Sequence, residues 1–191
     1  MRDSKRSKVY AAERAAFRGN EKATTEFKSV RSAQSFVNRV IGSKWWKEYD
    51  APRFAEGGSS YRNDLREHSI TVKSQANRYR TSTAGYDYEK PFGGFSDPDE
   101  YIGFTVKVAV INLAPGWGFQ KWVILHELAH HLNPELPSHG RLFCRVYLDL
   151  VGHWLGTAAK KRLREEFTKR GVKYSKPQSE ASREVIAACR R

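Results

Sequence analysis

Two histidines and a glutamate within five consecutive positions are the residues of this sequence best suited to chemistry. His126, Glu127 and His130 form the pattern H-E-x-x-H. On a helix that turns 100° per residue, His126 and His130 lie about 40° apart, so both imidazoles can approach one metal ion. Glu127 is rotated to the flank of that face, which suits a base acting on metal-bound water better than a ligand. The pattern predicts a catalytic zinc (Zn2+) site, although a structural pair of helical histidines beside an incidental glutamate would give the same letters.

A zinc ion that keeps an open position for water needs a third protein ligand, and His139 is the best candidate. Pro134 and Pro137 end the preceding helix and turn the chain. Ser138 can cap the helix that follows, and Gly140 adds no side chain to crowd the metal. This spacing predicts that His139 reaches the ion held by the two helical histidines.

Three acidic residues and one more histidine are the alternatives to His139 as the third ligand. Asp149 is the main rival, but a straight helix from His139 would place it about 15 Å further along, so the two should not bind one ion. Glu165 and Glu166 lie in a polar stretch after an expected helix break. His131 points about 100° away from its neighbour in the motif and is expected on the surface or behind the ligands.

The site helix is expected from about Phe119 to Leu132, with its end at Asn133-Pro134. Its apolar residues gather on the side opposite the histidines; they are Ile124, Leu125, Leu128 and Leu132. That stripe would anchor the helix and leave the histidines facing a cleft. The preceding segment, Tyr101 to Leu113, alternates apolar and polar residues, which predicts a strand with one buried face.

The remaining chain shows a mixture of helical and β-prone patterns. Residues 50–99 are rich in glycine and proline and contain β-prone pieces such as His68 to Lys73, which predicts loops and short strands. Helical spacing predicts helices over residues 8–18, 35–46, from Ser138 to Leu150, 157–170 and 182–189. The expected fold class is therefore α+β.

Length and composition indicate a globular protein with one domain. The chain has 191 residues and a mass of 21.9 kDa, enough for one well-buried core. Charged residues at 29% and a mean hydropathy of -0.69 argue against a membrane protein. Residues 1–31 carry nine Lys or Arg and no apolar stretch that would form a signal peptide. The two cysteines, Cys144 and Cys189, are expected as thiols, so the composition indicates a cytoplasmic protein.

The net charge of +13 is concentrated at the two ends of the chain. Residues 1–31 hold nine basic and four acidic side chains, and residues 160–191 hold eleven and four. Such ends can attract nucleic acid or an acidic protein. They support an alternative function, a basic nucleic-acid or protein-binding module in which the zinc site is structural or vestigial.

The motif and its surroundings resemble a known group of enzymes. The segment from Val123 to Leu132, followed after a short loop by His139-Gly140-Arg141-Leu142-Phe143, is similar to the H-E-L-x-H … H-G-x-x-F pattern of SprT-like zinc metallopeptidases. It is more similar still to a small family of HExxH metallopeptidases in actinobacteria and their phages, and the resemblance covers about Tyr101 to Val172. It implies a zincin fold and peptidase chemistry, with His126, His130 and His139 as ligands and Glu127 as base.

The residue patterns and the resemblance together predict how the chain is divided into an arm, a domain and a tail. A basic helical arm (1–30) precedes a single zincin-like domain (31–172) with a small sheet, the HExxH helix and flanking helices, and a basic tail follows (173–191). In zincins an edge strand precedes the site helix, so residues 101–113 would align an extended protein or peptide substrate by backbone pairing. The expected function is zinc-dependent peptide hydrolysis through a metal-bound water, with Glu127 as general base.

Overall fold

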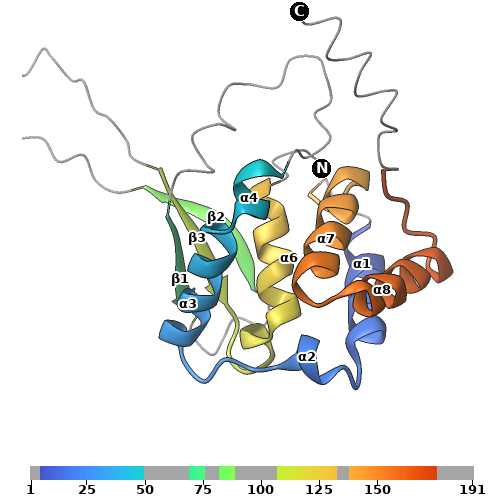
Figure 1. The fold of residues 1–191 in the computed structure, drawn as a ribbon, viewed down its shortest axis with the longest axis horizontal. Helices are drawn as coiled ribbons and strands as arrows, with labels where there is room; N and C mark the ends of the chain where they lie inside the picture. Colours follow the sequence, from blue (N-terminus) through green and yellow to red (C-terminus); the bar gives the residue numbers. More distant parts are fainter. Residues whose placement is uncertain (1–4, 50–68, 76–81, 89–106, 133–137, 176–191) are drawn as a thin grey trace, which may run out of the picture. The chain divides into compact units, whose positions relative to one another are not determined.

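The computed structural model describes residues 5–49, 69–75, 82–88, 107–132 and 138–175. The fold is mixed α+β, as predicted, and consists mostly of helices together with one small sheet (Figure 1). The elements in chain order are α1 (Arg6–Phe17), α2 (Glu21–Thr24), α3 (Val30–Ile41), α4 (Lys44–Glu48), β1 (Ile70–Ser74), β2 (Thr83–Tyr88), β3 (Lys107–Leu113), the 3-10 turn η1 (Trp117–Phe119), α6 (Lys121–Leu132), α7 (Arg141–Trp154) and α8 (Thr157–Lys169).

The helix expected over residues 35–46 is two helices, α3 and α4. A capping box starts α3, because the Ser29 hydroxyl accepts a hydrogen bond from the Ser32 backbone N–H and the Ser32 side chain accepts one from the Ser29 N–H. α3 ends at Ile41 and is capped by Gly42, and the hydroxyl of Ser43 then accepts a hydrogen bond from the Trp46 N–H at 3.1 Å. This serine cap starts a new helix where the apolar period alone suggested a continuous one.

The sheet places β3 in the middle, in the order β1-β3-β2. β1 pairs with β3 in parallel, with Ile70 opposite Ala109, and β2 pairs with β3 antiparallel, with Thr83 opposite Asn112 (Figure 1). The strand before the site helix was expected to lie at an edge of the sheet. This expectation is wrong for β3, because β1 and β2 pair with its two edges. Residues 101–106 of the expected strand lie outside the described residues.

The burial of β3 differs from the expectation of one buried face. Three successive residues, Ala109, Val110 and Ile111, are all buried, although their side chains point alternately to opposite faces. Both faces of this part of the strand are covered, which is the usual situation for a central strand between packed layers.

Gln34 of α3 covers part of the outer edge of β1. Its side-chain oxygen accepts a hydrogen bond from the Val72 N–H at 2.7 Å, and its amide nitrogen donates to the Ile70 carbonyl at 2.8 Å. The two backbone groups would otherwise lack the partners that a further strand provides. One side chain thus replaces two ladder hydrogen bonds and fixes α3 beside β1.

The described elements group into two compact units. Of the described residues, 5–24, 49, 132 and 138–175 belong to the first unit, which includes α1, α7 and α8; the second contains 25–48, 69–75, 82–88 and 107–131, which include the sheet and nearly all of α6. In the first unit α8 packs against both α1 and α7, with Phe17, Leu163 and Phe167 fully buried. The boundaries expected from the sequence at residues 30 and 172 stay predictions.

Several expectations concern residues that are not described. The helix over residues 182–189, the thiol of Cys189 and the helix end at Asn133-Pro134 lie outside the described residues. Cys144 is a buried thiol on α7, as predicted. Among the described helices, none combines the length and the apolar character required to cross a membrane.

Substitution of Gln34 by leucine is predicted to destabilise the protein. The change leaves a backbone N–H and a carbonyl of β1 without their side-chain partners, which should lower the free energy of unfolding by about 1 to 3 kcal/mol. Urea denaturation followed by circular dichroism measures the change. Ser35→Ala, on the exposed side of the same helix, is the control and should lose less; equal stability of Gln34→Leu and wild type would contradict the role of this amide.

Candidate metal centre

α6 brings the first two histidines of the motif together. The Nε2 atoms of His126 and His130 lie 3.2 Å apart, and the ring planes are inclined at 72°. Two imidazole nitrogens that each lie 2.0 to 2.1 Å from a tetrahedral zinc are about 3.3 Å apart. The spacing of these two nitrogens therefore fits a shared zinc ion.

His139 lies in a turn immediately before α7. Its ring contacts the rings of Tyr10 on α1 and Phe143 on α7 edge-on, with centroid distances of 5.4 Å and 4.9 Å. The expected cap by Ser138 is wrong: Gly140 occupies the cap position of α7, which has no side-chain cap. Because Gly140 is extended there, the helix begins at Arg141 and His139 stays in the preceding turn.

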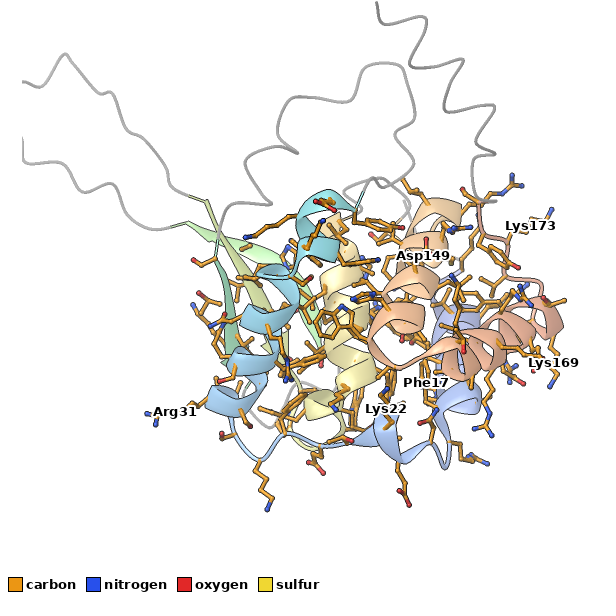
Figure 2. The ribbon with its side chains drawn as sticks, in the orientation of Figure 1. Phe17, Lys22, Arg31, Asp149, Lys169 and Lys173 are labelled. Atoms are coloured by element: carbon orange, nitrogen blue, oxygen red, sulfur yellow. The ribbon has the colours of Figure 1, made fainter. Side chains whose placement is uncertain are left out.

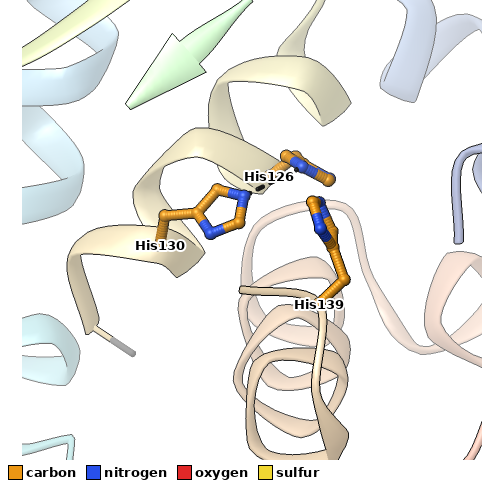
Figure 3. A group of neighbouring side chains, drawn as sticks. All are labelled: His126, His130 and His139. Atoms are coloured by element: carbon orange, nitrogen blue, oxygen red, sulfur yellow. Dashed lines mark hydrogen bonds between the residues drawn. The ribbon is translucent and has the colours of Figure 1, made fainter. Parts of the chain in front are cut away.

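The structure brings His126, His130 and His139 together. One ligand nitrogen from each residue lies within 4.8 Å of the others, and Figure 3 shows the three imidazoles converging. His126 and His139 are buried, with exposed fractions of 2% and 5%. Three neighbouring imidazoles can hold a metal ion, and within the described segments they are the one such group of histidine, cysteine and acidic residues.

Asp149, the main rival ligand, belongs to a separate cluster of charged and polar side chains on and around α7. Its carboxylate accepts hydrogen bonds from the Tyr49 hydroxyl at 2.9 Å, from Arg145 Nε at 2.6 Å and from Lys160 Nζ at 2.7 Å (Figure 2 labels Asp149). Burial raises the pKa of Tyr49 above its usual value, and the charge of Asp149 raises it further. Asp149 thus stabilises the contacts of α7 instead of joining the three histidines.

The other acidic candidates lie on α8. Glu165 is exposed, and Glu166 forms ion pairs with Lys169 and Arg170 in the next turn of the helix. Neither residue belongs to the three-histidine group. Such pairs on a helix surface contribute little to stability and indicate no metal site.

The site helix is buried almost all round, and the expectation that its histidines face a cleft stays a prediction. The apolar stripe is buried as predicted, but His126, Glu127 and Ala129 on the remaining faces are buried too. Polar groups in such a setting lose contact with water and need partners within the protein or a bound ligand.

His131 was expected on the surface or behind the ligands, and the surface position is wrong. Its side chain is only 8% exposed and forms a hydrogen bond with the backbone of Val110 on β3. Burial lowers the pKa of His131 to about 4, although the hydrogen bond opposes this effect. A neutral His131 therefore anchors the end of α6 to the sheet.

The contribution of α1 to the surroundings of His139 was not predicted from the sequence. Its buried face follows the helical period and consists of Val9, Ala12, Glu13, Ala16 and Phe17. A glutamate in the middle of this apolar face is the signal that could have revealed the contribution. Burial raises the pKa of Glu13 well above its usual value, whereas the charges of His139 and Arg14 lower it.

Comparison with protein-family models, curated proteins and solved structures gives no match. The resemblance to SprT-like and actinobacterial HExxH metallopeptidases therefore stays a prediction based on the motif and its spacing.

Substitution of Asp149 by asparagine should separate stability from metal binding. Asparagine cannot provide a charged acceptor for Arg145 and Lys160, so the free energy of unfolding should fall by about 1 to 3 kcal/mol. Zinc content, measured by mass spectrometry, should stay at the wild-type value. Glu165→Gln, which alters an exposed carboxylate, is the control. A folded Asp149→Asn protein without zinc would instead identify Asp149 as a ligand.

Proposed function

We propose that this protein is a zinc-dependent metallopeptidase with a zincin-like fold. The observation that carries the proposal is the convergence of His126, His130 and His139, with ligand nitrogens within 4.8 Å of one another. Glu127 follows the first of these histidines directly and is buried. The three imidazoles would hold the ion, and Glu127 would act as the general base.

The donor set favours a transition metal of the zinc type. Three imidazoles suit zinc and its neighbours, whereas magnesium and calcium prefer oxygen ligands. Three protein ligands are also the number found when zinc keeps one position open for water or substrate. When bound, zinc supplies a Lewis acid that polarises a carbonyl group and makes water more acidic.

Glu127 has a different task from the histidines, because it stands outside the three-histidine group. Its carboxylate would accept a proton from the attacking water and return that proton to the amine that leaves. Its low exposure, 3%, keeps this proton transfer away from bulk solvent. No such base is needed at a purely structural zinc site, so the presence of Glu127 supports an enzyme.

β2 is the strand best placed to bind an extended peptide. β3 is paired on both edges, and Gln34 occupies the outer edge of β1 at Ile70 and Val72. β2 is the other edge of the described sheet and runs antiparallel to β3. A substrate would add to this edge by backbone hydrogen bonds.

Binding of nucleic acid by the basic ends stays a prediction.

Single substitutions are predicted to separate metal binding from proton transfer. His126→Ala, His130→Ala and His139→Ala each remove a ligand and should reduce zinc content below that of wild type. Glu127→Gln keeps the shape of the side chain but cannot accept a proton, so it should retain zinc and lose turnover by about 100-fold or more. Zinc is measured by mass spectrometry, and turnover by the cleavage of an unfolded protein.

His153→Ala is the matched control for the ligand variants. His153 also lies on a helix, but it is exposed and does not belong to the three-histidine group. This variant should keep both zinc and turnover. Full cleavage by Glu127→Gln would exclude the proposed base, and wild-type zinc content in all three ligand variants would exclude the proposed centre.

A further inference from the structure

We propose that Glu13 of α1 is a positioning residue for His139 and holds its imidazole in the orientation that binds the metal. The inference rests on the proposed function and adds a residue far from the H-E-x-x-H motif in the sequence. Its chemistry is that of a carboxylate which accepts the N–H of a ligand histidine on the ring nitrogen that does not bind the metal.

The burial of Glu13 requires an explanation. Its exposed fraction is 0%, and its neighbours on the inner face of α1 include Val9 and Phe17, which are also buried. A carboxylate in apolar surroundings is strongly unfavourable unless positive charge or hydrogen-bond donors compensate for its lost hydration. An alanine or leucine would fill this face of α1 without that penalty, so the glutamate has a role other than packing.

The contact between Tyr10 and His139 places α1 beside the proposed ligand. The two ring centroids lie 5.4 Å apart, with the planes at 80° to each other. Tyr10 and Glu13 are three residues apart on one helix, so their side chains emerge on neighbouring parts of the same face. The face of α1 that contacts His139 therefore also carries the buried carboxylate.

His139 is also a source of compensating charge for Glu13. A positive charge on the imidazole favours the ionised carboxylate, and this effect is larger than that of the adjacent Arg14, which is exposed. A metal ion bound to His139 makes the ring N–H a stronger donor and so strengthens its pairing with a carboxylate. Phe143 contacts the same ring from α7 and limits its rotation. Glu13 and the two aromatic rings would together fix the imidazole.

The test measures zinc affinity in the full chain by competition with a chromophoric chelator, for wild type and Glu13→Gln. Glutamine has nearly the same shape but no negative charge, so the variant should bind zinc about 10- to 100-fold more weakly. The melting temperature of the metal-free protein should not fall, because glutamine keeps the shape of the side chain and avoids the cost of burying a carboxylate. Asp149→Asn is the matched control: it removes a carboxylate from another cluster and should lower the melting temperature without changing zinc affinity.

The outcomes distinguish the two proposals. Wild-type affinity in Glu13→Gln, within twofold, would overturn the role of Glu13 and leave the metal centre intact. Absence of zinc binding by wild type would overturn both. Should Glu13→Gln not fold, nuclear magnetic resonance of zinc-loaded wild type decides the matter: a through-space contact between the His139 ring N–H and the Glu13 side-chain protons supports the pairing, and its absence overturns it.

Discussion

Several polar side chains of α6 are buried, and the neighbouring elements must compensate for their lost hydration. α6 places His126, Glu127 and His131 in the interior, where each loses most of its contact with water. A buried imidazole or carboxylate is stable only when hydrogen bonds, opposite charge or a metal ion compensate for that loss. The elements that contact these residues must therefore supply polar partners as well as apolar surface.

The sheet supplies part of this compensation and also fixes α6. The backbone of Val110, on the central strand, forms a hydrogen bond with His131. The chain leaves β3 at Ala114, whose N–H donates to the buried hydroxyl of Ser82 at 3.0 Å, and reaches α6 through η1. Since strand and helix are connected by so short a segment, the pairing of β3 with β1 and β2 also limits where the histidines of α6 can lie.

Neighbouring charges decide what each buried or half-buried carboxylate does. Asp149 receives hydrogen bonds from Tyr49, Arg145 and Lys160, so it joins the segments around α7. Glu13 lies in an apolar helix face, where His139 is the main compensating charge. Both are acidic residues in amphipathic helices, and only their surroundings separate a stabilising role from one near the proposed metal centre.

Features that depend on local geometry could be predicted from the sequence. The approach of His126 to His130 follows from their i, i+4 spacing within one helix, and apolar periods likewise predicted α1, α7 and α8. Three features could not be predicted in this way: β3 is the central strand, α6 is buried almost all round, and Tyr10 and Glu13 of α1 lie near His139. These features depend on pairing and packing between segments far apart in the chain, and a local pattern of apolar residues specifies that a face is buried but not which segment buries it.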